Sequence, residues 1–499
     1  MDVLLQKFDY KYMAYEQELL RLELHALLPN AVLEQRGRQF ALHNVALENI
    51  AVLDRLTYIA AYCVEGTWHH TKQYKLEQDK NKNLKKQNTR YASHGIHEYK
   101  GKFNPQIVHA LLNILGVKDG NTILDPFCGS GTTLVESAIW GFSAHGIDIN
   151  PLAAQLSVLK IKVLALDCVQ AAKDLDAAVK YLSGKFDASG FTYAKNPRND
   201  YLLNWLPQEM FWLLERLIQF TDTIDETTAL LFKISASNLI RDYSLQEPLD
   251  LRIRRRSSPM PETPFVEAWA KMIARQLDCI SHAQQHIGRL QINSIAELND
   301  IRVKASSGQL FDAAITSPPY ATALPYIDTQ RISLVWLGLC RPKDIMELES
   351  SLIGSREFYH TQKELLHDKM VHNEAALPDG VISLIQRLQS DLSVEDGFRK
   401  KAVPLLLYRY FSDMKKMFHN VRSMLKPGGK YALVVGNNKT TIGGQLNVID
   451  TPALLVQIAL TSGWRVVRVL PLQTYQRYGL NAKNAITRET LIILEKVAE

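Results

Sequence analysis

The hydrophobic positions of the chain follow one period in its first part and another further on. Residues 1 to about 66 show helix-like spacing of leucines, for example at Leu19, Leu20 and Leu24, followed by a second apolar stretch at 45–62. This pattern predicts a small helical or mixed accessory domain over residues 1–66. Residues 67–92 are rich in Lys, Asn and Gln. We expect a basic linker there, because few apolar side chains are available to offset the entropy of ordering.

From residue 107 onward, helical spacing alternates with short apolar runs. The pattern predicts a helix over 107–115, a strand over 122–124, a helix from 133 and a strand over 144–147. Strands that alternate with helices form a mostly parallel sheet covered on both faces. Residues 93–160 are therefore predicted to form the first half of an α/β domain.

The second half of this domain is predicted over residues 291–499. Its apolar strands are expected at 311–316, 430–435, 464–470 and 490–494. Helical spacing dominates 161–290, which predicts a helical insertion suited to DNA recognition, and a second insertion is expected at 321–400. The predicted fold class is thus α/β: one doubly wound sheet with helical insertions and a small N-terminal accessory domain.

Composition indicates a soluble globular protein. The chain has 499 residues, of which 46% are hydrophobic and 22% charged. It lacks a run of roughly 20 apolar residues and a signal-like start, so we expect a cytoplasmic location and no membrane partner. The five cysteines form no Cys-x-x-Cys pair, and His69, His70, His94 and His97 lack a nearby cysteine or acidic cluster. No disulfide framework and no metal site are expected.

Positive charge is concentrated in a few segments. Between Thr71 and Arg90, two acidic residues accompany seven basic ones, namely Lys72, Lys75, Lys80, Lys82, Lys85, Lys86 and Arg90. A solvated linker and a phosphate-attracting segment are both compatible with this run. A second cluster comprises Arg252, Arg254, Arg255 and Arg256. Arginine binds phosphates or guanine edges, so this cluster is the predicted DNA-binding site, with a salt-bridged helix end as the alternative.

A glycine-containing turn follows the strand at 122–124 and precedes a helix. Gly129 and Gly131 lack a Cβ, so the backbone can approach a ligand while the helix N-terminus presents free amides. Asp148 ends the next strand, where it can accept hydrogen bonds from a ribose. Dinucleotide binding is the competing interpretation, but Leu134 stands where the third glycine of that fingerprint would be.

The residues Asp125-Pro-Phe-Cys-Gly-Ser-Gly-Thr-Thr133, with Gly146-Ile-Asp-Ile-Asn-Pro151 after them, closely resemble the cofactor motifs of amino-directed DNA methyltransferases. The resemblance implies a Rossmann-like methyltransferase sheet and S-adenosylmethionine as cofactor. Upstream, the segment His97–Pro105 resembles the family's Lys-Phe-x-Pro segment, which closes over the methionine end. The cofactor-binding residues that the resemblance implies are Lys102, Phe103, Asp125, Pro126, Phe127, Gly129, Gly131, Thr132, Asp148 and Asn150.

The strand at 311–316 ends in Ser317-Pro318-Pro319-Tyr320. An exocyclic amine is a poor nucleophile because its lone pair is delocalised, and acceptors for its N–H groups favour the pyramidal geometry needed for attack. The Ser317 hydroxyl and the rigidly held Pro318 carbonyl offer such acceptors, and Tyr320 offers a ring on which an extruded base can stack. By itself such a tetrapeptide could merely end a strand.

Ser-Pro-Pro-Tyr is also the signature of the resembling family and is most typical of its cytosine-N4 members. Double-stranded DNA is then the expected substrate, with adenine N6 as the alternative target and room for a restriction or defence-system partner. Cytosine-C5 chemistry is excluded, since position 317 is serine and Cys340 is distant. Two further alternatives remain, a tRNA guanosine-N2 methyltransferase and a catalytically silent nucleic-acid-binding subunit.

The resemblance continues at Pro325–Ile327, Trp336–Gly338, Leu425–Asn437 and Thr487–Glu495. One departure concerns the acidic residue that the family often carries before the catalytic strand, where it contacts the cofactor adenine. Asn293-Ser294 aligns best with this position, and Asp300 lies further along.

Overall fold

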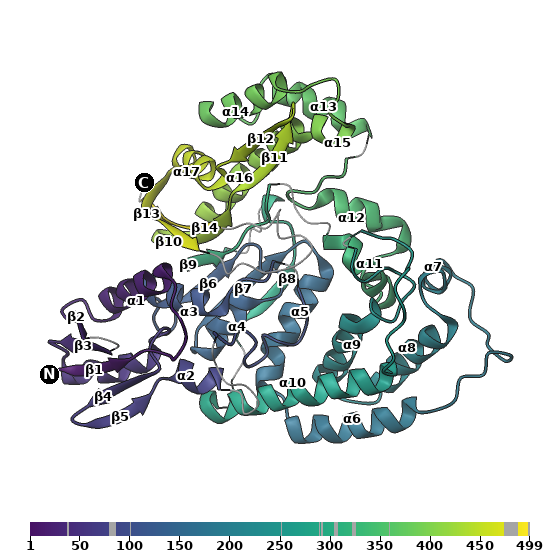
Figure 1. Cartoon of the computed structure of the whole chain (residues 1–499), viewed down its shortest axis with the longest axis horizontal. Coiled ribbons are helices and arrows are strands. Elements are labelled where there is room, and N and C mark those ends of the chain that lie inside the picture. The colour runs from purple at the N-terminus through teal and green to yellow at the C-terminus, as the bar shows by residue number, and fades with distance from the viewer. Residues whose placement is uncertain are drawn as a thin grey trace.

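The computed structural model describes residues 1–36, 39–78, 86–99, 101–250, 252–288, 290, 293–303, 308–321, 326–358, 360–473 and 488–497. Residues cited above that lie outside this part are Lys80, Lys82, Lys85, Pro325 and Thr487. The described residues form a five-stranded sheet, a seven-stranded sheet and a two-stranded hairpin, with helices around them (Figure 1). None of the described helices is long and apolar enough to cross a membrane.

The N-terminal sheet has the strand order β2-β3-β1-β4-β5, and each neighbouring pair is antiparallel. The leucine spacing corresponds to helix α1, but the pattern did not predict the strands, because four or five residues are too few for a clear period of two. The strands are β1 (Val3–Gln6), β2 (Val32–Arg36), β3 (Gln39–His43), β4 (Ala61–Val64) and β5 (Thr67–His70). The helices are α1 (Ala14–Leu27), the 3-10 helix η1 (Leu47–Arg55) and α2 (Lys72–Glu77).

The central sheet has the order β13-β14-β10-β9-β6-β7-β8. Neighbours from β8 to β10 run parallel, whereas β14 is antiparallel to both β10 and β13. The predicted doubly wound α/β class is confirmed. The edge strand β8 was missed, because its residues are exposed or half-buried and give little apolar signal. The strands are β6 (Thr122–Asp125), β7 (Ser143–Asp148), β8 (Ile295–Leu298), β9 (Phe311–Thr316), β10 (Leu425–Gly436), β13 (Trp464–Gln473) and β14 (Arg488–Lys496).

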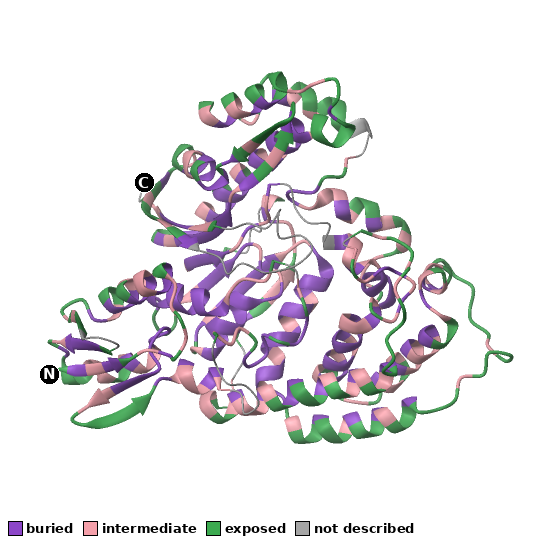
Figure 2. Ribbon diagram, viewed as in Figure 1, coloured by how far each residue is buried: buried purple, intermediate pink, exposed green. Residues whose placement is uncertain are grey.

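Both faces of this sheet are buried, as the central ribbons of Figure 2 show. On β10, Val434 packs into a core shared with the N-terminal domain, whereas Val435 packs into a second core with the helices of the C-terminal half. Burial on both faces explains the uninterrupted apolar run of this strand. The helices around the sheet are α3 (Pro105–Ile114), α4 (Thr132–Ile139), α5 (Pro151–Lys162), η3 (Ile301–Val303), α16 (Val403–Met424) and α17 (Thr451–Thr461).

Two groups of helices interrupt the sheet, and a hairpin follows β10. In Figure 1 the first group lies at the lower right, and α13, α14 and α15 lie at the top beside the hairpin. The first group is η2 (Val163–Ala165), α6 (Cys168–Leu182), α7 (Pro197–Trp205), α8 (Gln208–Thr221), α9 (Glu226–Ile240) and α10 (Phe265–Ile287). The second is α11 (Tyr326–Trp336), η4 (Pro342–Asp344), α12 (Ile345–Ser351), α13 (His360–Val371), α14 (Asp379–Ser390) and α15 (Phe398–Lys401). The hairpin is β11 (Asn438–Ile442) and β12 (Gln445–Ile449).

Candidate active site

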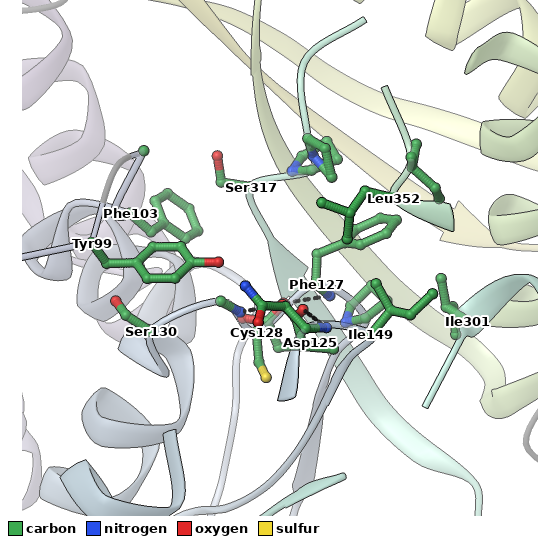
Figure 3. Close-up of a pocket in the computed structure, with 18 of the residues that line it drawn as sticks. Tyr99, Phe103, Asp125, Phe127, Cys128, Ser130, Ile149, Ile301, Ser317 and Leu352 are labelled. Atoms are coloured by element: carbon green, nitrogen blue, oxygen red, sulfur yellow. Dashed lines mark hydrogen bonds between the residues drawn. The ribbon is translucent and has the colours of Figure 1, made fainter. Parts of the chain in front are cut away.

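A pocket lies where the three neighbouring parallel strands β6, β7 and β9 end (Figure 3). The carboxyl ends of such strands meet at one edge of a sheet, which is where open α/β sheets bind ligands. The pocket joins the two predicted loops, since all the predicted cofactor-binding and catalytic residues except Gly131 line it. These are Lys102, Phe103, Asp125, Pro126, Phe127, Gly129, Thr132, Asp148, Asn150, Ser317, Pro318, Pro319 and Tyr320.

Gly131 shapes the glycine turn from beneath the pocket. Its φ is +78°, and an added Cβ would lie 2.8 Å from the Ser157 Oγ and 2.9 Å from the Ser157 Cα. The Ser157 hydroxyl donates a 2.9 Å hydrogen bond to the Gly129 carbonyl. Helix α5 therefore packs directly under the turn, and only a residue without a side chain fits at position 131.

Asp148 ends β7 with both carboxylate oxygens engaged by backbone amides. Oδ2 accepts a 2.8 Å hydrogen bond from the Gly129 amide, and Oδ1 accepts a 2.9 Å bond from the Asn150 amide. Burial raises the pKa of Asp148 to about 6, although these hydrogen bonds oppose the shift. Each carboxylate oxygen has a further lone pair, so Asp148 can also accept hydrogen bonds from a ligand.

Asp125 links the glycine turn to the catalytic strand. Its Oδ1 accepts a 3.1 Å hydrogen bond from the Phe127 amide and a 2.6 Å bond from the hydroxyl of Thr316, the last residue of β9. Burial raises the pKa of Asp125 to about 6, and hydrogen bonds from Thr133, Thr316 and Phe127 oppose the shift. The two predicted loops are thus joined by a direct side-chain contact.

The segment before α3 contributes aromatic rings to the pocket. In Figure 3, Tyr99 and Phe103 face it from one side, and Phe127 and Leu352 from the other. Lys102 lies in the same segment and stabilises it through hydrogen bonds to the backbone. Its amino group donates to the Thr89 carbonyl at 2.8 Å and to the His94 carbonyl at 3.0 Å. Burial lowers the pKa of Lys102 to about 7. Sequence reasoning did not single out the apolar lining residues Ile301, Leu352 and Ile353, which lie in no motif, or Ile149, which lies within the motif 146–151 but was given no role.

The residues before β9 differ in whether they reach the pocket. Ser294 is buried and its hydroxyl accepts a 3.0 Å bond from the Ala144 amide, away from the pocket lining. Asn299 and Asp300 do line the pocket. The Asp300 carboxylate is also paired with Arg302 at 2.7 Å. Asp300 is therefore the acidic residue that this region brings to the pocket.

Three distant segments hold the tetrapeptide 317–320, which is the predicted catalytic segment. The Ser317 hydroxyl donates a 3.2 Å hydrogen bond to the Val434 carbonyl in β10. The Pro319 carbonyl accepts a 3.0 Å bond from the Tyr410 hydroxyl in α16. The Tyr320 hydroxyl donates a 2.8 Å bond to Glu489 Oε1 in β14. No sequence signal identified these partners, because each is more than 90 residues from the residue that it contacts.

Two of the four predicted DNA-binding arginines are anchored by side-chain hydrogen bonds to other residues of the helical insertion. Arg255 donates to the Asn204 side chain at 2.6 Å and stacks on the Trp205 ring, 4.5 Å from its centroid. Arg256 donates a 2.8 Å bond to the Asp242 carbonyl. These guanidinium groups anchor the 252–256 loop to the helical insertion.

The other two arginines, Arg252 and Arg254, have exposed side chains, as Arg255 also does. Arg254 lies 3.7 Å from Asp250 in an ion pair. Arg252 belongs to a positive group with Arg356 and Arg399 of the second insertion. Burial lowers the pKa of Arg356, and the charges of Arg252 and Arg399 lower this pKa further. Positive charge from both insertions therefore meets around Arg356.

The sequence of the chain is similar to those of known methyltransferases in a region that forms part of the pocket. Residues 96–178 match the family described as "RMKL-like, methyltransferase domain", and this stretch includes the glycine turn and Asp148. The fold class is that of a Rossmann-like methyltransferase sheet. The match to a methyltransferase domain over the glycine turn and Asp148 supports S-adenosylmethionine as the expected cofactor.

Three relatives illustrate the range of similarity. The chain is 23% identical over 463 residues to Type II methyltransferase M.BsoBI of Geobacillus stearothermophilus, covering 82% of this chain and 86% of the relative. It is 23% identical to Type II methyltransferase M.MvaI of Kocuria varians, covering 70% and 78%. A shorter match, 42% identical over 52 residues, is to a tRNA (guanine(10)-N2)-dimethyltransferase of Methanothermobacter thermautotrophicus and covers 10% and 16%.

The chemistry of the pocket fits this cofactor. The two carboxylates, Asp125 and Asp148, suit the hydroxyl and ammonium groups of S-adenosylmethionine, and the aromatic rings suit a sulfonium cation. Ile149 and Ile301 provide apolar surface for an adenine ring. Among the described residues there is no cluster of three or more His, Cys, Asp or Glu side chains suited to a metal ion.

Proposed function

We propose that this chain is a site-specific DNA methyltransferase that transfers a methyl group to the exocyclic amine of a flipped base, with cytosine N4 as the target. One observation carries the proposal: the 2.6 Å hydrogen bond between Thr316 and Asp125 joins the cofactor turn to the catalytic tetrapeptide in a single pocket. A methyl donor bound on the turn would lie beside Ser317 and Tyr320, as methyl transfer requires.

DNA as the substrate is supported by the relatives that match most of the chain. M.BsoBI and M.MvaI are both named Type II methyltransferases, and their matches cover 82% and 70% of this chain. The tRNA enzyme matches only 52 residues. A partner from a restriction or other defence system is part of the same proposal, and the Type II designation supports it.

In this proposal, the cofactor is held by residues that the strand ends bring together. Asp148 accepts hydrogen bonds from the ribose hydroxyls, with Asn150 fixing the turn behind it. Asp125, Pro126, Phe127, Gly129 and Thr132 surround the methionine half, and Gly131 keeps the turn open for it. Lys102 and Phe103 close over this end, where the Lys102 amino group holds its segment through backbone carbonyls. Asp300 lies on the adenine side.

Bound S-adenosylmethionine would supply an electrophilic methyl group: the S–CH3 bond would break as the N–CH3 bond forms, S-adenosylhomocysteine would leave as the neutral thioether, and the amine would lose one proton to solvent. The chain's task is then to hold the target amine so that its lone pair points at the methyl carbon. The Ser317 hydroxyl donates a hydrogen bond to the Val434 carbonyl. The lone pairs of the Ser317 oxygen therefore remain available to accept a hydrogen bond from an amine N–H. The Pro318 carbonyl, held by the proline ring, is the second acceptor, Pro319 stiffens the turn, and the Tyr320 ring stacks on the base.

Cytosine is favoured over adenine because position 317 is serine. In the resembling family, a carboxylate at this position mostly accompanies adenine, whereas serine mostly accompanies cytosine. Both bases carry similar amines, so Tyr320 and the Pro318 carbonyl would serve either one. Adenine N6 is therefore the alternative target.

Arg252 and Arg254 are proposed to contact DNA phosphates, because their side chains are exposed and are not the ones that anchor the loop to the helical insertion. The positive group around Arg356 would extend this contact to the second insertion. Arg255 and Arg256 then serve the same site indirectly, by fixing the loop.

The test is to incubate the protein with S-adenosylmethionine and genomic DNA and to analyse the nucleosides by mass spectrometry. N4-methylcytosine is the expected product, and Ser317→Ala should remove most of it with little change in cofactor affinity. N6-methyladenine alone would overturn the base assignment. Methylation of RNA alone would favour a tRNA guanosine-N2 enzyme, and cofactor binding without methylation of any nucleic acid would favour a silent binding subunit.

A further inference from the structure

The Tyr320 hydroxyl is bound by a residue of the last sheet strand to which the sequence analysis assigned no role at the site. Glu489 is the second residue of β14 and lies opposite Gly436 of β10 in the sheet. Its Oε1 accepts a 2.8 Å hydrogen bond from the Tyr320 hydroxyl. Tyr320 and Glu489 are 169 residues apart, and both are half-buried.

The backbone beside Tyr320 is fixed by a second residue. Tyr410 lies in α16 with 1% of its surface exposed, and its hydroxyl donates a 3.0 Å bond to the Pro319 carbonyl. A fully buried hydroxyl needs such a partner. Because the carbonyl of Pro319 belongs to the peptide unit that leads into Tyr320, this bond sets the direction in which the ring leaves the backbone.

We propose that Glu489 and Tyr410 are positioning residues for capture of the flipped nucleobase. Glu489 holds the hydroxyl end of the Tyr320 side chain, and Tyr410 holds the backbone from which this side chain leaves. The inference rests on the proposed function, in which Tyr320 stacks on the flipped base. A ring fixed at both ends loses little conformational entropy on stacking, whereas a ring that rotates freely must be ordered at the moment of capture.

In the contact between Tyr320 and Glu489, the hydroxyl donates the hydrogen bond and the carboxylate accepts it. The variants are therefore chosen to remove either the donor or the acceptor. Glutamine retains an oxygen acceptor at the same place, so Glu489→Gln should preserve the contact, whereas Glu489→Leu removes it at similar volume. Tyr320→Phe removes the same hydrogen bond from the other side and keeps the stacking ring. Tyr410→Phe removes the backbone contact and keeps the buried ring.

The experiment first establishes, with the wild-type protein, which base in which DNA sequence is methylated. Failure at this step would refute the proposed function and not the positioning inference. The variants are then compared on a duplex with that sequence, by single-turnover methyl transfer, by the fluorescence of 2-aminopurine at the target position and by calorimetry with S-adenosylmethionine.

We expect Glu489→Leu and Tyr320→Phe each to lower the transfer rate and base extrusion about tenfold, as loss of a hydrogen bond to a charged group predicts. The double variant should be no slower than either single variant, because both remove one interaction. Glu489→Gln should retain most of the rate, Tyr410→Phe should lower it severalfold, and cofactor affinity should stay within twofold throughout.

Multiplicative effects of Glu489→Leu and Tyr320→Phe would overturn the inference, since the two residues would then act separately. A Glu489→Gln variant as slow as Glu489→Leu would also overturn it, by showing that charge and not hydrogen-bond acceptance matters. Should Glu489→Leu fail to fold, Tyr320→Phe with Glu489→Gln tests the same contact: an unchanged Tyr320→Phe rate would refute it.

Discussion

The hydroxyl of Thr316 donates a 2.6 Å hydrogen bond to the carboxylate of Asp125, joining the last residue of β9 to the last residue of β6. Both side chains are buried. The two strands are neighbours in the sheet but lie 191 residues apart along the chain. This bond therefore connects the glycine turn after β6 directly to the end of β9.

Thr316→Val should raise the pKa of Asp125 further above 6, because the Thr316 hydrogen bond stabilises the ionised carboxylate. At pH 7 more of Asp125 is then protonated, and cofactor affinity near neutral pH should fall. The loss of a partner for a buried acceptor should also cost about 1–3 kcal/mol of stability. Calorimetry across pH and thermal unfolding measure both effects, and Thr316→Ser, which keeps the hydroxyl, is the control. Equal pH profiles for the two variants would contradict the coupling.

Cofactor affinity should decrease as the pH falls through about 6, where Asp148 takes up a proton. Because burial raises this pKa, the folded state binds the proton more tightly than the unfolded chain does, so protonation of Asp148 does not itself unfold the protein. The loss of binding should therefore precede any loss of structure. Asp148→Asn should bind more weakly, by about 1–3 kcal/mol, at neutral pH. A wild-type affinity that stays constant from pH 7 to 5 would argue against this role.

Gly131→Ala should be more destabilising than Gly141→Ala. Both glycines have similar positive φ values, +78° and +81°, so both substitutions carry the same backbone strain of about 1 kcal/mol. An added Cβ at 141 meets nothing within 4 Å, whereas at 131 it would meet Ser157 at 2.8 Å. We expect an extra 1–3 kcal/mol of destabilisation, roughly, for Gly131→Ala, with loss of cofactor binding. Chemical denaturation compares the two, and equal stabilities would show that the turn can move away from α5.

Replacing Arg252 and Arg254 by alanine should weaken DNA binding and reduce its log-log salt slope by up to about two units, since two phosphate contacts are lost. Arg255→Ala should mainly lower stability, because Arg255 holds Asn204 and stacks on Trp205. Filter binding at several salt concentrations, beside thermal unfolding, separates the two outcomes. An unchanged slope in the double variant would show that Arg252 and Arg254 do not contact phosphates. Arg399 would then be the next residue to test.

The sequence predicted most of the sheet that carries the site. The apolar runs at 311–316 and 430–435 fall within β9 and β10, and the strand at 144–147 is contained in β7. These strands are buried on both faces, so each gives a strong local signal. The exposed edge strand β8 and the short strands of the N-terminal sheet gave little signal and were missed.

The sequence by itself determined which residue types stand at the strand ends: the glycine turn, Asp125, Asp148 and the tetrapeptide that begins at Ser317. Periodicity and motif spacing are local properties of the chain, so they can be read without knowing the fold. The tertiary structure alone decided what holds these residues in place, including Val434 beside Ser317 and Glu489 beside Tyr320. These contacts depend on strand order and on the packing of helices onto the sheet, and no pattern confined to one segment of the chain encodes them.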